Sequence, residues 1–64
     1  MSSPLSDPQS KLRHDLSSPL AAILAEVQLL LLVADRFDAE TVTSLKQIES
    51  LARRMRDMLH PPRA

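Results

Sequence analysis

The stretch RHDLSSPL, residues 13–20, places a histidine directly beside an aspartate. An imidazole is a nucleophile and a proton carrier near neutral pH, and a neighbouring carboxylate orients its ring and raises its nucleophilicity. Pro19 follows one turn later, although a proline inside a helix costs about 3 kcal/mol. A costly proline so close to a histidine–aspartate pair favours a chemical role for His14 and Asp15 over that of ordinary surface residues.

The composition of the 64 residues excludes several kinds of chemistry. The chain has no cysteine, so a disulfide framework is excluded, and its two histidines lie too far apart in sequence to predict a metal site. It also has no glycine, which excludes the glycine-rich loops that bind nucleotide phosphates. We therefore expect no metal and no cofactor bound by this chain itself.

Charge and hydropathy limit the partners. The net charge is zero and Phe37 is the single aromatic residue, which argues against nucleic-acid binding. The longest apolar run, residues 29–34, is far shorter than the roughly 20 residues that a membrane span requires. The first residues lack the basic-then-apolar pattern of a signal peptide. These features predict no membrane segment and a cytoplasmic location.

Two helices are predicted to position the histidine. Asp7 and Pro8 form a helix-start signal, because aspartate caps free N–H groups and proline is tolerated at the first helical position. Helix-forming residues then continue from Gln9 to about Ala34, and residues 35–37 form a short connection.

The second helix is predicted from Ala39 to Leu59, with Asp38 as its N-cap. It ends at His60, because the two following prolines disfavour the helical conformation before them. The short connection makes the pair an antiparallel hairpin. We expect a flexible segment at residues 1–6, one domain at residues 7–60 and a tail at residues 61–64.

The spacing of apolar residues predicts an all-α fold that is completed by a second copy. Apolar residues recur at steps of three and four along both helices, which is typical of a helical bundle seam. The first helix is apolar over more than one face, and a single hairpin cannot bury that much apolar surface. We therefore predict a homodimeric four-helix bundle. The seams comprise Leu12, Leu16, Leu20, Ile23, Val27, Leu30 and Ala34 in the first helix, and Thr41, Leu45, Ile48, Ala52, Met55 and Leu59 in the second.

A helical wheel directs the histidine outward. At about 100° per residue, His14 lies roughly 165° from the centre of the predicted seam and faces solvent. Asp15 lies about 100° further round, and Ser18 shares the face of His14. Pro19 is expected to bend the helix locally, since it removes the hydrogen bond to the carbonyl of Asp15.

The segment HDLSSPL, residues 14–20, resembles the phosphoacceptor box of sensor histidine kinases, which reads His, Glu or Asp, Leu, a basic residue, Thr, Ser or Asn, Pro and Leu. The following AAIL, the short turn and the segment LARRMRDML near the end of the second helix continue the resemblance. It covers about Ser10 to Leu59, and it implies a dimerisation and histidine phosphoacceptor domain of two-component signal transduction.

The resemblance implies a role for each matching residue. His14 would accept the γ-phosphoryl group of ATP on Nε2, and Asp15 would orient the ring through Nδ1. Ser18 matches the polar position that helps to place a water for dephosphorylation, and Pro19 matches the bend that lets the helix flex. Ser17 departs from the family's basic residue, which puts one contact to the phosphoryl group or the catalytic domain in doubt.

The family's ATP-binding domain is missing from this chain, so the resemblance implies a phosphorelay module that is not an active kinase alone. A histidine kinase ATP-binding domain would bind the ATP and Mg²⁺, and a response regulator receiver domain would accept the phosphoryl group on an aspartate. The alternative is a dimeric helical scaffold that regulates a kinase or response regulator by binding alone, with His14 unphosphorylated.

A row of small and apolar residues points away from the predicted seam and is called the outer strip. Small side chains allow another helix to approach closely, and the resemblance implies docking of a receiver domain here. Lys46 and Gln47 of the second helix would form a polar rim. Two alternatives stay open: alanine simply favours helix formation, and Leu29 is buried in the dimer. The outer strip comprises Ser18, Ala21, Ala22, Ala25, Leu29 and Leu32.

Overall fold

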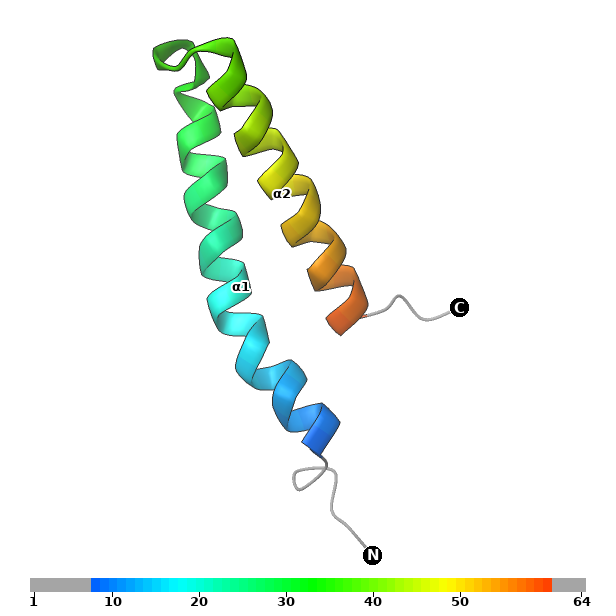
Figure 1. Cartoon of the computed structure of the whole chain (residues 1–64). Coiled ribbons are helices and arrows are strands. Elements are labelled where there is room, and N and C mark those ends of the chain that lie inside the picture. Colours follow the sequence, from blue (N-terminus) through cyan, green and yellow to red (C-terminus); the bar gives the residue numbers. More distant parts are fainter. Residues whose placement is uncertain (1–7, 61–64) are drawn as a thin grey trace, which may run out of the picture.

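The computed structural model describes residues 8–60, which form a helical hairpin (Figure 1). Helix α1 spans Pro8–Leu32, a short 3-10 helix η2 spans Ala34–Arg36, and helix α2 spans Ala39–Leu59. The two long helices run antiparallel and lie against one another, and the first turns of α1 extend past the end of α2. The predicted all-α hairpin is confirmed. The predicted cap at Asp7, the segment 1–6 and the tail 61–64 lie outside the described residues.

Helix α1 runs unbroken through Pro19. Its ribbon changes direction in the cyan part of Figure 1, so that the N-terminal turns are inclined relative to the rest. Proline has no N–H to donate, so the carbonyl of Asp15 lacks its usual helical partner. One turn earlier, the Ser17 hydroxyl donates to the Arg13 carbonyl at 2.6 Å, a side-chain bond that is often found where helices bend.

The first helix ends at Leu32, two residues before the predicted end at Ala34. Three-residue hydrogen bonds then tighten the chain: Val33 N–H donates to Leu30 at 3.1 Å, and Arg36 N–H donates to Val33 at 2.9 Å. The last turn of a helix commonly tightens in this way because its final carbonyls lack α-helical partners. The residues predicted as a plain connection are therefore partly a 3-10 turn.

Helix α2 has the predicted bounds. The Asp38 carboxylate accepts a hydrogen bond from the Thr41 N–H at 2.8 Å, which confirms the predicted N-cap. Hydrogen bonding from the Thr41 side chain, together with that from its backbone N–H, holds the pKa of Asp38 below its ordinary value, because both stabilise the ionised carboxylate. At the other end, the His60 N–H donates to the Arg56 carbonyl at 2.8 Å and closes the last turn.

The hairpin is one layer thick and buries little. Its principal-axis extents are 55 × 23 × 14 Å, and its two long helices lie side by side in a single layer. Four apolar side chains of the described residues are buried: Leu20, Leu24, Val27 and Ala52. Leu24 is buried although it lies outside the predicted seam, whereas Ile23 and Leu30 belong to the predicted seam and are exposed. A single partner helix covers only a narrow stripe of α1, so part of the wide apolar surface of α1 is buried and the rest is exposed.

Much of the exposed apolar surface lies on one side of the hairpin, here called the apolar face. At about 100° per residue, the exposed apolar residues of both helices are rotated in the same direction from the buried stripe. Leu12 and Met58 line one shallow hollow, which places the two helices' contributions together at the open end. The apolar face comprises Leu12, Leu16, Ile23 and Leu30 of α1 and Ile48, Leu51, Met55 and Met58 of α2.

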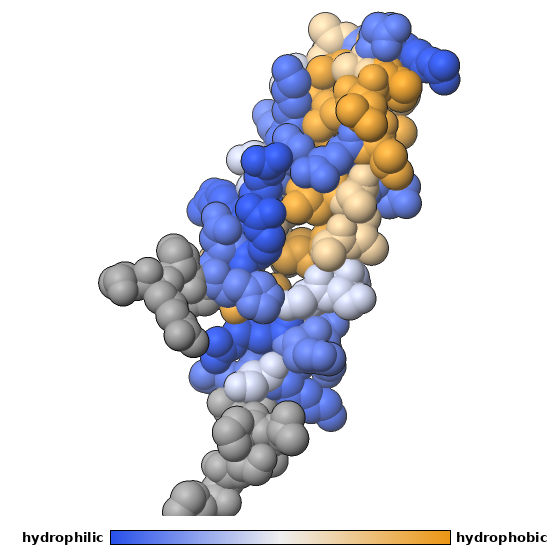
Figure 2. All heavy atoms as spheres, turned by 180° about the vertical axis from the view of Figure 1, so that it is seen from behind, coloured by the Kyte–Doolittle hydropathy of each residue, from blue (hydrophilic) through white to orange (hydrophobic). Residues whose placement is uncertain are grey.

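The opposite side of the hairpin is seen in Figure 2. There α2 is largely polar, while apolar side chains gather along α1 toward the interhelix turn. By length and composition alone, α1 is apolar enough to cross a membrane. A core helix of a helical bundle has the same properties, so this feature is weak evidence for a membrane span.

Candidate functional site

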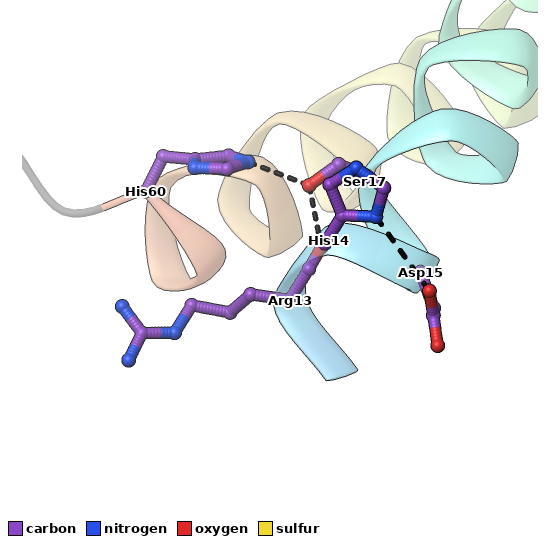
Figure 3. Close-up of polar contacts among 5 residues, drawn as sticks. All are labelled: Arg13, His14, Asp15, Ser17 and His60. Carbon is purple, nitrogen blue, oxygen red and sulfur yellow. Dashed lines mark hydrogen bonds and ion pairs between the residues drawn. The ribbon is translucent and has the colours of Figure 1, made fainter. Parts of the chain in front are cut away.

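The imidazole of His14 projects outward from the second turn of α1. Its side chain is 91% exposed, as the helical wheel predicts, and the adjacent Asp15 is 57% exposed. The His14 Nδ1 atom lies 3.6 Å from the Asp15 Oδ1 atom. Figure 3 shows the carboxylate on one side of the ring, with His60 on the other. The structure therefore brings together the two residues that the sequence predicts to act as nucleophile and orienting group.

This geometry distinguishes the two ring nitrogens. At 3.6 Å the contact is an electrostatic one rather than a short hydrogen bond, and it falls within ion-pair range when the imidazole is protonated. A carboxylate beside Nδ1 favours the tautomer that carries its proton there, which leaves a lone pair on Nε2. The side chain of His14 is exposed, so its ring is accessible to a group arriving from solvent.

His60 belongs to the same site, although the sequence reading gave it no role beyond ending the second helix. Its Nε2 atom lies 2.6 Å from the Ser17 hydroxyl, so a side-chain bond joins α1 to the end of α2 (Figure 3). Both histidines line a pocket of about 300 Å³, together with Ser10, Arg13 and Ser17. The sequence signal that could have located His60 is the count of residues back from the turn along both helices, which places the end of α2 beside the turns of α1 that carry His14 and Ser17.

Ser18, Pro19 and the outer strip are exposed but do not form one surface. Ala21 and Ala25 line a groove of about 350 Å³ between the helices, which also includes Ser17, Arg56 and His60. Gln47 lies elsewhere, in a shallow polar hollow of α2.

By the helical wheel, Ala22 and Leu29 point away from α2, and Leu29 is exposed. Lys46 is exposed on the groove side. The structure therefore brings His14, Asp15 and Ser17 into one site, while the predicted partner-binding residues spread over two sides of the hairpin.

The site offers no metal-binding cluster. Within residues 8–60, no group of three or more histidine, cysteine, aspartate or glutamate side chains is arranged to hold a metal ion. Comparisons with protein-family models, with curated proteins and with solved structures found no significant match to this chain. The chemistry of the site is therefore argued from its own residues and from the resemblance of residues 14–20.

Proposed function

We propose that this chain is a homodimeric histidine phosphoacceptor and phosphotransfer module of two-component signal transduction, with His14 as the phosphorylated residue. The observation that carries the proposal is the outward His14 ring, 91% exposed, with Asp15 beside its Nδ1 atom. The resemblance of HDLSSPL to the phosphoacceptor box supports the same role. A buried ring or a ring without a carboxylate would have lacked this support.

The proposed reaction has two phosphoryl transfers. In the first, the Nε2 lone pair of His14 attacks the γ-phosphorus of ATP, the N–P bond forms, and the bond to the bridging oxygen breaks as ADP leaves. Asp15 stabilises the positive charge that develops on the imidazole. In the second, an aspartate oxygen of a receiver domain attacks the phosphorus, and the N–P bond breaks as its electrons return to His14.

We propose that the apolar face packs against the same face of a second copy of the chain. A hairpin one layer thick with four buried apolar side chains lacks the core that an independent domain requires. Two hairpins packed through this face form a four-helix bundle and bury those exposed residues. His14 lies on the groove side of α1 by the helical wheel, so dimerisation through the apolar face leaves its ring accessible.

The remaining parts of the reaction are assigned to partners. A histidine kinase ATP-binding domain supplies ATP and Mg²⁺, and a receiver domain docks near His14, against the outer strip. Ala21 and Ala25 support this because small side chains open the groove next to the site. Lys46, on the groove side of α2, forms a polar rim in this proposal, whereas Gln47 lies outside it. A cytoplasmic location follows from the need for ATP.

A labelling experiment separates the phosphoacceptor from a binding-only scaffold. The protein is incubated with a histidine kinase ATP-binding domain and γ-labelled ATP, and the acid-labile, alkali-stable label is counted. The intact chain is expected to take up label, His14→Gln to take up none, and the matched His60→Gln variant to be labelled. A His14→Gln variant labelled as fully as the intact chain contradicts the assignment, and it leaves the scaffold function in place.

A further inference from the structure

The pocket between the two histidines is lined by residues whose side chains can donate hydrogen bonds. Its volume is about 300 Å³, and it is lined by Ser10, Arg13, His14, Ser17 and His60. No carboxylate belongs to that lining, since Asp15 lies on the other side of the His14 ring (Figure 3). A small concave surface with this set of groups is complementary to a compact anion with several acceptor oxygens.

His60 is held in place at this pocket from two directions. Its backbone N–H is bonded to the Arg56 carbonyl at 2.8 Å, and its Nε2 atom is 2.6 Å from the Ser17 hydroxyl. That hydroxyl in turn donates to the Arg13 carbonyl at 2.6 Å, so Ser17 accepts from the His60 Nε2–H. The ring is therefore positioned by both helices, one turn along α1 from His14.

The surroundings of His60 are cationic. Arg13 lines the pocket on one side, and Arg56 lines the adjoining groove, which shares Ser17 and His60 with the pocket. Asp57 forms an ion pair with Arg56, with 3.7 Å between Nε and Oδ1, and it is not among the residues that line the pocket. Guanidinium groups recognise phosphate oxygens through paired N–H donors, which a bare imidazole does not provide.

We propose that His60, Arg13 and Ser17 form a binding site for a phosphate dianion beside His14. The chemistry is that of a tetrahedral phosphoryl group, supplied either as free inorganic phosphate or as the phosphoryl group carried on His14 Nε2. In the second case the inference rests on the proposed function. His60 is then a positioning residue that donates to a phosphoryl oxygen and exchanges its bond with Ser17 for that contact.

The first test uses inorganic phosphate and the unphosphorylated protein. Phosphate is titrated at constant ionic strength while the imidazole and backbone NMR signals are followed. The signals of His60 and Arg13 are expected to shift, and the affinity is expected to fall about fivefold or more in His60→Gln and in Arg13→Gln. The matched control is Arg54→Gln, which removes one exposed guanidinium on the far side of α2 and is expected to bind phosphate normally.

The second test uses phosphoramidate, whose P–N bond breaks with loss of ammonia as the His14 Nε2–P bond forms. The phosphohistidine of His60→Gln is expected to hydrolyse about threefold faster than that of the intact chain, because the phosphoryl oxygens lose a donor that shields them from water. Circular dichroism shows whether each variant remains helical. The Arg54→Gln control is expected to keep the half-life of the intact protein.

The outcomes separate this site from the proposed function. Phosphate affinity that depends on His60 and Arg13 in a protein whose His14 takes no phosphoryl group supports the site and contradicts the phosphoacceptor role. Equal phosphate affinity in the intact chain, His60→Gln and Arg13→Gln, together with an unchanged phosphohistidine half-life, overturns the site and leaves the phosphoacceptor role standing.

Discussion

The chemistry of the site rests on the distinction between the two nitrogens of His14. An imidazole in free solution exchanges its proton between Nδ1 and Nε2, whereas a fixed carboxylate beside one nitrogen favours the proton there. Asp15 provides that carboxylate from the next residue of the helix, at 3.6 Å from Nδ1. The arrangement requires no tertiary structure beyond a helical turn, which explains why the sequence alone predicts it.

The Asp15→Asn variant tests this orienting role. The amide keeps the shape of the side chain but lacks the negative charge that stabilises the developing imidazolium. The initial rate of His14 phosphorylation is expected to fall roughly tenfold, which is less than the hundredfold or more typical of acid–base groups, because the pair is exposed. The rate is measured by labelling at saturating ATP-binding domain. An unchanged rate contradicts an orienting role for Asp15.

His60 shows where sequence reasoning stops at the residue scale. Its type and its position before two prolines predict a helix end, and the structure confirms that helix α2 ends before it. Its contact with Ser17, 43 residues earlier, depends on the register of α1 against α2. That register is set by the length of the turn, and the predicted end of the first helix at Ala34 differs from the observed end at Leu32.

At the scale of the element, Pro19 weakens the helix that carries His14. It lies inside α1, where an alanine would restore the hydrogen bond to the Asp15 carbonyl. Pro19→Ala is expected to raise the free energy of unfolding by about 1–3 kcal/mol, measured by urea denaturation at fixed protein concentration. A bend that assists the reaction predicts slower phosphotransfer in this more stable variant. Lower stability after the change would contradict the view that Pro19 strains α1.

The N-cap at Asp38 makes the stability contributed by helix α2 depend on pH. Hydrogen bonds from the Thr41 side chain and from its backbone N–H hold the pKa of Asp38 below its ordinary value. The ionised cap therefore stabilises the fold above the unfolded-state pKa, and this effect is lost as the pH falls through the folded-state pKa. Asp38→Ala is therefore expected to lower the thermal midpoint at pH 7 and to differ less from the intact chain below about pH 4. Thermal melts followed by circular dichroism at both pH values test this. If the difference in thermal midpoint between Asp38→Ala and the intact chain grows at the lower pH, the ionised Asp38 carboxylate is not the stabilising form.

The helix ends were predictable because caps are local. Asp38, Ala39 and Leu59 are specified by the residue types that immediately surround them, and the structure places all three as the sequence predicts. The stripe that α1 buries is less local. Leu24 replaces Ile23 in the contact with α2, because α1 offers apolar residues in several directions and the partner helix selects among them.

At the scale of the whole molecule, the thin hairpin and its apolar face belong to one proposal. Isolated apolar residues on a surface are ordinary, but Leu12, Leu16, Ile23 and Leu30 continue along about five turns of α1 and adjoin a matching row on α2. The sequence predicts the amount of apolar surface, while the single-chain structure shows which part the hairpin itself leaves exposed. The second copy remains a proposal.

Substitution of Ile48 tests the proposed dimer. Ile48→Glu places a charge on the apolar face, and a symmetric interface receives it twice. The dissociation constant of the dimer is expected to rise at least about a hundredfold, measured by sedimentation equilibrium at micromolar concentration. Thr43→Glu, on the polar outer side of α2, is the matched control and is expected to remain dimeric. An intact chain that sediments as a folded monomer rules out the bundle.

The most direct test of the phosphoacceptor proposal is the position of the phosphoryl group on the protein. After incubation with an ATP-binding domain, ¹⁵N–³¹P coupling in the labelled chain identifies the nitrogen that carries phosphorus. The orientation of His14 by Asp15 predicts one phosphohistidine per chain, at Nε2 of His14. Phosphorus on Nδ1, on His60 or on no histidine would contradict it.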